Sequence, residues 1–181
     1  GARLLAKILA GGYTGAVHPV NPNASEIQGL PASPTVEAIG VPVDLVVVAV
    51  PAPAVLDVAR DAGRAGARSL LVLSAGFAEA GPEGAERQQE LLAVCRAAGM
   101  RLVGPNCLGV INTHPSVRLD ATFGAAQPRR GRVGMMSQSG AVGLVLLERA
   151  AQLGIGISSF VSVGNKADLT GNDFLRYWQH D

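Results

Sequence analysis

Two short segments contain the residues best suited to hold an anion. They read Gly-Pro-Asn-Cys-Leu-Gly at 104–109 and Ser-Gln-Ser-Gly at 137–140. Each follows an apolar run typical of a buried strand, and the second also begins an apolar helical pattern. Amides at the start of a helix favour phosphate or carboxylate. The pair therefore indicates an active site built between two domains, with one anion-binding loop from each side.

Ser137, Ser139 and Gly140 are the predicted phosphate-binding residues of the second segment. The two serine hydroxyls add hydrogen-bond donors to the free amides of the helix start. The alternative interpretation is that Ser139 only caps the helix, because serine is a preferred residue at that position.

In the first segment, Asn106 and Cys107 are the candidate catalytic residues. The Asn106 amide can hold a polar substrate group, and the Cys107 thiol is a candidate nucleophile. No histidine follows Cys107 at a spacing that suggests an activating base, which favours a structural thiol instead. The alternative for the whole segment is a shaped turn, because its glycines allow the backbone to approach closely.

Four further segments directly follow predicted strands: 21–22, 51–53, 74–76 and 164–166. Nearly all of their residues are small, polar or proline, and they include no charged catalytic pair. Ligands of open parallel sheets bind at the carboxyl ends of the strands. We therefore expect a crevice that holds an extended ligand through backbone groups. The sequence contains no spacing of His, Cys, Asp or Glu residues that is typical of a metal site. The three histidines have no neighbour in sequence that would make them bases. Glu79 is expected to be solvated.

Composition supports an α/β protein. The 181 residues are 48% hydrophobic and 16% charged, with 23 glycines for tight turns. The net charge of +1 favours neither nucleic acid nor a membrane surface as partner. The two cysteines, Cys95 and Cys107, form no disulfide framework, which predicts a reducing, cytoplasmic setting. The longest apolar run, 45–50, is too short to span a bilayer.

Strand and helix patterns alternate along the chain, which predicts parallel sheets with right-handed crossovers. Helices are predicted over 3–10, 35–39, 54–65, 84–98, 140–153 and 172–179, and strands over 15–20, 44–50, 69–73, 101–103, 132–136 and 156–163. Residues 113–130 lack periodicity and are expected to be a linker. The pattern predicts two domains, 1–126 and 127–181. No strand precedes the first helix, so we expect a fragment whose first strand is missing and whose second domain is cut short.

In chain order, these segments resemble the NDP-forming acyl-CoA synthetases, relatives of the succinyl-CoA synthetase α subunit. The residues that carry the resemblance are Val-Asn-Pro at 20–22, Val-Ala-Val-Pro-Ala-Pro at 48–53, Ser-Ala-Gly-Phe at 74–77, the segments 104–109 and 137–140, and Ser-Val-Gly-Asn-Lys-Ala-Asp at 162–168. The resemblance implies a Rossmann-like CoA-binding domain followed by a partial flavodoxin-like domain.

The resemblance also implies a role for each loop. CoA would be held by Asn21, Pro22, Val50, Pro51, Ala52, Ser74, Ala75 and Gly76. Asn106 and Cys107 would lie near the CoA thiol, where acyl transfer occurs, and Ser137, Ser139 and Gly140 would hold the phosphate. The complete enzyme, an oligomer with an ATP-grasp domain or subunit, would interconvert acyl-CoA, ADP and phosphate with acid, CoA and ATP. It would use Mg²⁺ and a phosphohistidine outside this chain, so the chain alone is expected to be inactive.

Two alternatives remain open. The first is a catalytically inactive, acyl-CoA-binding regulatory region fused to a GNAT-type protein lysine acetyltransferase, because the same ligase-like region occurs in such fusions. The second alternative is a plain NAD-binding Rossmann domain. The sequence disfavours it, because Asn21-Pro22-Asn23 stands where an acidic ribose-binding residue is expected.

Overall fold

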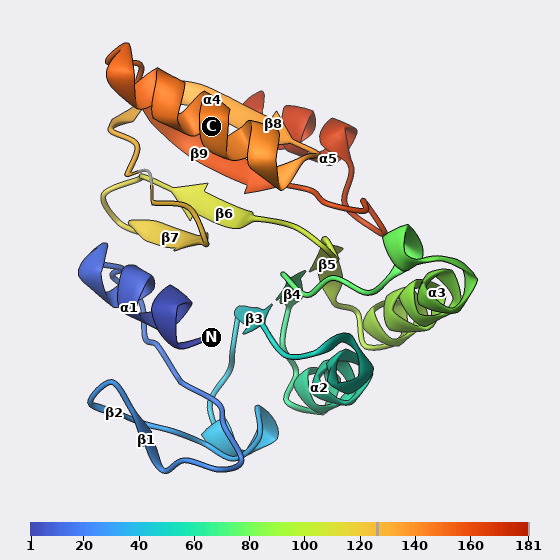
Figure 1. The fold of residues 1–181 in the computed structure, drawn as a ribbon. Coiled ribbons are helices and arrows are strands. Elements are labelled where there is room, and N and C mark those ends of the chain that lie inside the picture. Colours follow the sequence, from blue (N-terminus) through green and yellow to red (C-terminus); the bar gives the residue numbers. More distant parts are fainter. Residues whose placement is uncertain (126, 181) are drawn as a thin grey trace.

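A three-stranded parallel sheet forms the first half of the molecule. The computed structural model describes residues 1–125 and 127–180. Strands β3 (Leu45–Val48), β4 (Ser69–Val72) and β5 (Arg101–Val103) pair in that order. Helices α2 (Ala52–Arg64) and α3 (Pro82–Ala97) cover one face of this sheet (Figure 1). These elements agree with the helices and strands predicted from the sequence pattern.

Alternate residues of β4 supply both faces of the first sheet, as the two-residue period of a strand requires. Leu70 and Val72 are buried against α2 and α3, in the cluster that also contains Val55 and Leu91. Leu71 points the other way, into a second cluster. That cluster includes Leu4 and Ile8 of helix α1 (Ala2–Ala10) and residues of the second sheet. The first sheet is therefore covered on both sides.

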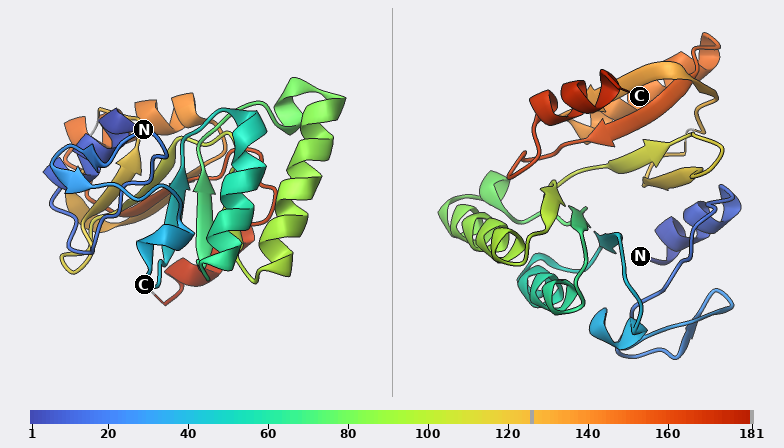
Figure 2. Two further views of the ribbon diagram at one scale, coloured as in Figure 1. Left: turned by 90° about the horizontal axis from the view of Figure 1, so that it is seen from below. Right: turned by 180° about the vertical axis from the view of Figure 1, so that it is seen from behind.

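A four-stranded mixed sheet forms the second half. Its order is β7 (Leu119–Thr122), β6 (Gly109–Asn112), β9 (Ile157–Ser162) and β8 (Arg130–Ser137). Strands β8 and β9 are parallel, whereas β6 is antiparallel to both β7 and β9. Helix α4 (Gly140–Gln152) and helix α5 (Gly171–Trp178) lie on opposite faces of this sheet (Figure 2). The expectation of parallel pairing throughout is wrong for β6 and β7.

The predicted linker 113–130 is also wrong in part, because it contains β7 and the start of β8. Strand β7 reads Leu-Asp-Ala-Thr, so no continuous apolar run marks it as a strand. The predicted domain boundary falls at residue 126, which lies outside the described residues. On either side of it, β7 and β8 belong to one sheet.

The strand predicted over 15–20 is wrong: within it only Val20 forms a bridge, to Ser33. Pro19 has no amide to donate to a ladder. A short hairpin follows instead, formed by β1 (Glu26–Ile27) and β2 (Leu30–Pro31). Its two turn residues both have positive φ, +53° at Gln28 and +80° at Gly29, as a two-residue hairpin loop of the favoured twist requires.

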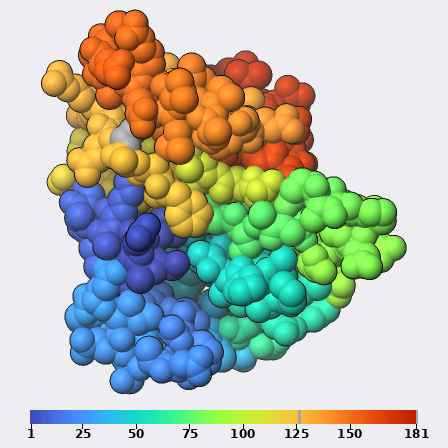
Figure 3. All heavy atoms as spheres, viewed as in Figure 1, coloured from blue at the N-terminus to red at the C-terminus, as the bar shows by residue number. Residues whose placement is uncertain are grey.

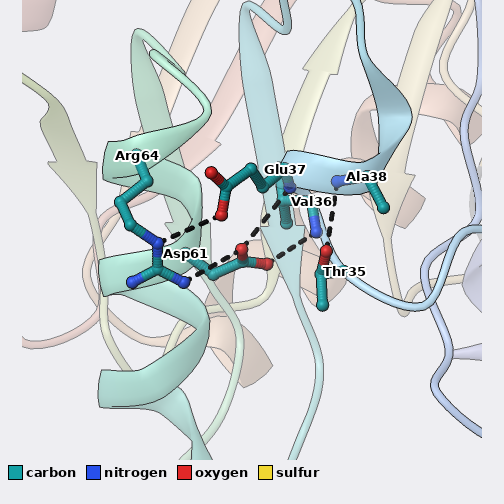
Figure 4. A network of polar contacts seen from close by, with 6 residues as sticks. All are labelled: Thr35, Val36, Glu37, Ala38, Asp61 and Arg64. Atoms are coloured by element: carbon teal, nitrogen blue, oxygen red, sulfur yellow. Dashed lines mark hydrogen bonds and ion pairs between the residues drawn. The ribbon is translucent and has the colours of Figure 1, made fainter.

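The helix predicted over 35–39 is a single 3₁₀ turn, η1 (Glu37–Ile39), fixed to α2 by hydrogen bonds (Figure 4). The Asp61 carboxylate accepts from the amides of Val36 at 2.6 Å and Glu37 at 3.4 Å. Arg64 pairs with both Asp61 and Glu37. The turn thus takes its capping group from α2 rather than extending into a helix of its own.

Candidate active site

The chain passes from the first sheet to the second through 104–108, one of the two loops singled out by sequence. Gly104 has a φ of +95° and Gly109 one of +126°, values that favour glycine. A β-carbon on Gly109 would collide with the Ala121 carbonyl. The Asn106 amide donates to the Ser74 carbonyl at 3.0 Å. The loop is thereby joined to the end of β4 as well as to the two strands it connects.

Within this loop, Cys107 and Asn106 have different surroundings. The Cys107 side chain is buried and its thiol donates to the Val72 carbonyl, with a sulfur–oxygen distance of 3.3 Å. Burial raises the pKa of this thiol to about 12. The thiol is therefore protonated at neutral pH, which supports a structural role over a nucleophilic one. Asn106 is only partly buried, and its side-chain amide donates to Asn165 Oδ1 at 3.4 Å.

The loop after β9 meets the 104–108 loop through its backbone. The Asn165 amide donates to the Pro105 carbonyl at 2.9 Å, and the Ala167 amide to the Gly104 carbonyl at 3.1 Å. Gly164, at φ +52°, lies so close to the backbone of Pro105 and Asn106 that a β-carbon would not fit. The sequence indicates this loop by its place after a strand and by the segment 162–168, which contributes to the family resemblance, but it predicts no role for Asn165.

Glu79 connects this loop to the first sheet. Its carboxylate accepts from the amides of Gly76 at 2.6 Å and Phe77 at 3.1 Å, and from Asn165 Nδ2 at 2.5 Å. Partial burial raises the pKa of Glu79, but these hydrogen bonds together outweigh it, so the pKa lies below its usual value. The Glu79 side chain is exposed, as expected of a solvated position, but its hydrogen bonds to the backbone and to Asn165 were not predicted from the sequence.

The segment 137–140 begins α4, as its sequence predicts. The Ser139 side chain caps the helix by accepting from the Val142 amide at 3.3 Å. Ser137 is buried, and its hydroxyl donates to the Ser139 carbonyl at 2.7 Å. The capping interpretation is therefore confirmed. It leaves the Ser139 hydroxyl hydrogen and the amides of Gly140 and Ala141 to donate to a ligand, since the Val142 and Gly143 amides donate to Ser139.

One cavity of about 800 Å³ brings the two predicted loops together. Five parts of the chain line it: the end of β4, the first loop, the end of β7, the start of α4 and the loop after β9. The lining residues are Leu73, Asn106, Cys107, Leu108, Phe123, Gln138, Ser139, Gly140, Ala141, Leu144, Gly164 and Asn165. Gly140 lies against Leu108, where an added β-carbon would be 3.3 Å from the leucine Cβ. The two loops therefore lie side by side in the wall of the cavity.

The residues predicted to hold CoA lie along the neighbouring edge of the first sheet. Val50, Pro51 and Ala52 follow β3, and 74–76 follow β4. The Ser74 hydroxyl donates to the Val50 carbonyl at 2.5 Å, so the two segments are in contact. Gly76, at φ +100°, packs on Ala52, where an added β-carbon would be 2.9 Å from the alanine Cβ. This edge adjoins the cavity through Leu73 and the Ser74–Asn106 hydrogen bond.

Asn21 and Pro22 belong to a separate loop. The Asn21 carboxamide oxygen accepts from the Asn23 amide at 2.8 Å, in a local turn, and the Asn21 amide donates to the Ser33 carbonyl at 2.9 Å. Neither residue lines the cavity. Within residues 1–125 and 127–180, no group of three or more His, Cys, Asp and Glu side chains gathers as a metal site would require. Nor does any helix of this part have the length and apolarity needed to cross a lipid bilayer.

The loops of the first sheet lie at the carboxyl ends of its parallel strands, where ligands of open α/β sheets bind, and the 104–108 loop leads from there to the second sheet. Residues 1–113 match the family described as CoA binding domain, and residues 130–181 match the succinyl-CoA ligase like flavodoxin domain. The chain therefore belongs to the CoA-binding domain family. The resemblance to NDP-forming acyl-CoA synthetases and the expected pair of α/β folds are confirmed.

The chain is similar to several ligases over nearly its whole length. It is 45% identical to the ADP-forming acetate–CoA ligase I of Archaeoglobus fulgidus, over 93% of this chain and 24% of that protein. It is 39% identical to the α subunit of ADP-forming acetate–CoA ligase II of Pyrococcus furiosus, over 90% of this chain and 35% of that subunit. The chain thus spans about a quarter to a third of these relatives.

A solved structure has the same fold. It is the acetyl-coenzyme A synthetase 1 of Ca. Korarchaeum cryptofilum in complex with phosphate and ADP. The TM-score is 0.94 at 41% sequence identity, covering 99% of this chain and 38% of that chain.

Proposed function

We propose that this chain is the CoA-binding part and the first ligase-like part of an acid–thiol ligase. The complete enzyme would interconvert acyl-CoA, ADP and phosphate with the free acid, CoA and ATP. The observation that carries the proposal is the single cavity shared by the 104–108 loop and the start of α4. A site that exchanges a thiol for a phosphate on one acyl group needs both recognition elements side by side.

CoA would lie along the edge formed by Val50, Pro51, Ala52 and residues 74–76, with the 21–22 loop at its far end. At the start of α2, the Ala52 amide would donate to the phosphates of CoA, since Pro53 has no N–H and the Ala54 amide already donates to the Pro51 carbonyl at 2.9 Å. The Ser74–Asn106 hydrogen bond marks the route from this edge into the cavity. The CoA thiol would enter there, with the Asn106 carboxamide orienting the acyl carbonyl and Cys107 holding the loop in shape.

Phosphate would bind at the start of α4, to the amides of Gly140 and Ala141 and to the Ser139 hydroxyl, with Ser137 supporting Ser139. In the direction of ATP synthesis, phosphate attacks the acyl carbon, the bond to the CoA sulfur breaks, and the acyl phosphate forms. Its phosphoryl group would then pass to a histidine outside this chain and on to ADP. A relative of 41% identity has been solved in complex with phosphate and ADP, which supports these two ligands for the complete enzyme.

Several wider features belong to the same proposal. The ADP site and its Mg²⁺ would lie on an ATP-grasp domain or subunit, and the complete ligase would be an oligomer. The CoA-binding part would span 1–126 and the ligase-like part 127–181. The two free, buried cysteines favour a cytoplasmic setting.

The test uses the complete enzyme with Ser139→Trp. Ser139 is exposed in the cavity wall, so the indole would fill the phosphate site while the fold is kept. We expect loss of enzyme phosphorylation from acetyl-CoA and phosphate, with CoA binding by calorimetry unchanged. Phosphorylation at the normal rate would overturn the phosphate site. CoA binding by a wild-type enzyme that never forms acyl-CoA would indicate a regulatory role instead.

A further inference from the structure

Phe123 is a large aromatic side chain placed in the wall of the cavity with 55% of its surface exposed. It directly follows Thr122, the last residue of β7, which is buried. A single exposed aromatic residue needs no explanation on an open surface. In a cavity wall, however, its ring is available to a ligand and contributes little to the core.

The backbone around Phe123 is held by the cavity's own walls. The Phe123 amide donates to the Leu108 carbonyl at 3.3 Å. Gly124 is buried against Leu144, so closely that a β-carbon would collide with the leucine side chain. Both leucines also line the cavity. The backbone that carries the ring is therefore held against the wall of the cavity.

Lys7 of α1 fixes the same segment from the other side. Its ammonium group donates to Thr122 Oγ1 at 2.8 Å and to the Gly124 carbonyl, and it pairs with Asp120 Oδ2 at 2.9 Å. The Lys7 and Asp120 side chains are only 16% and 13% exposed. Figure 3 shows the yellow and gold segment around residue 120 between blue α1 and orange α4. A partly buried, fully hydrogen-bonded ion pair of this kind favours one geometry.

The cavity has polar and apolar lining groups that suit an organic acid. Asn106, Gln138, Ser139 and Asn165 are polar, and Leu73, Leu108, Phe123 and Leu144 are apolar. A carboxylate or acyl phosphate held at the start of α4 leaves its carbon chain to face the apolar group. We propose that Phe123 determines which carbon chains are accepted and that Lys7 is its positioning residue. This inference rests on the proposed ligase function.

The test measures kcat/KM of the complete enzyme for acetate, butanoate and hexanoate. Phe123→Ala should raise the hexanoate-to-acetate ratio about tenfold or more, since even one methylene in an apolar pocket changes kcat/KM by about that factor. Phe123→Trp should lower the butanoate-to-acetate ratio. Val41→Ala is the matched control, because Val41 is 49% exposed in a loop away from the cavity, and its ratios should equal those of the wild type.

Lys7→Met keeps an unbranched side chain that is one atom shorter and removes its charge. It should raise the hexanoate-to-acetate ratio by a smaller factor than Phe123→Ala, and Lys7→Arg should restore part of the wild-type ratio. A uniform loss of rate for all three acids would show that Lys7 only stabilises the fold, which overturns its positioning role.

The outcomes separate the two proposals. A wild-type enzyme that is active, with chain-length ratios unchanged in both Phe123 variants, overturns the inference and leaves the ligase function intact. A wild-type enzyme that forms no acyl-CoA from any acid overturns the ligase function, and the inference with it.

Discussion

The backbone amide of Asn106 lies 3.0 Å from the carbonyl oxygen of Ser74 and donates a hydrogen bond to it. This contact joins the edge proposed for CoA to the loop proposed for acyl transfer. Because it uses only backbone atoms, it is independent of the side chain at either position. The relative placement of the two parts is therefore fixed before any ligand binds.

Replacing Gly109 by alanine should destabilise the junction strongly. The alanine would need a φ near +126° and its β-carbon would meet the Ala121 carbonyl, so we expect a loss of about 3 kcal/mol or more in unfolding free energy. Gly154→Ala is the control, since Gly154 has a φ of +70° but open space around it, and should cost only about 1 kcal/mol. Urea unfolding measures both; equal losses would argue against the steric explanation.

Two substitutions at Ser139 can separate capping from ligand binding. Ser139→Ala removes the acceptor for the Val142 amide and should cost about 1 kcal/mol, whereas Ser139→Gly should cost only a few tenths. Both remove the hydroxyl, so both should weaken phosphate binding to a similar degree. Thermal unfolding and phosphate titration would be compared. If phosphate affinity fell much more in Ser139→Ala than in Ser139→Gly, in parallel with the loss of stability, that result would contradict a direct role of the hydroxyl.

The Lys7–Asp120 pair should show energetic coupling. Lys7→Met leaves the Asp120 carboxylate with little solvent and should cost about 2 kcal/mol. Asp120→Asn in the same chain should then cost less than it does alone, with a coupling energy of about 1 kcal/mol. A double-mutant cycle in urea provides the measurement. Strict additivity would show that the 2.9 Å contact does not stabilise the fold.

Cys107 should make stability fall at high pH. Its folded-state pKa is about 12, above the usual 9.0, so the unfolded chain loses this proton first as the pH rises. The stabilising contribution of the neutral thiol is complete below pH 9.0 and is lost progressively toward pH 12. Unfolding free energies measured between these limits should decline less steeply for Cys107→Ala. Rapid alkylation of native Cys107 by iodoacetamide at pH 8 would contradict the burial.

Long helices and strands with an apolar run were predictable from sequence, whereas short strands without such a run were not. Helices α2, α3 and α4 have at least thirteen residues each, and their predicted bounds are close to those observed. Strands β3, β4 and β5 have only three or four residues but are mostly apolar, which marked them as buried strands. The hairpin β1–β2 and strand β7 mix polar and apolar residues over two to four positions, so no apolar run marks them. Each forms because a neighbouring strand supplies its hydrogen-bonding partner, which residue type alone does not show.

Some residues of the candidate site were predictable from the sequence, and others were not. The loops 104–109 and 137–140 were recognisable because glycine, asparagine and serine follow apolar strands. Phe123 gave no signal, since it lies in a stretch without periodicity, and its place depends on Lys7, more than a hundred residues earlier. Asn165 acquires its contacts only when the loop after β9 meets Glu79 and Pro105. Contacts of this kind follow from the fold and not from spacing.

The antiparallel pairing of β6 with β9 has a consequence for producing the two parts separately. A recombinant piece ending near residue 126 would retain β6 and β7 but lose β9, leaving one side of β6 without its hydrogen-bonding neighbour. Such an open edge is a template for association with other chains. Truncated versions should therefore tend to precipitate or exchange strands, and biochemical work is best designed around the intact second sheet.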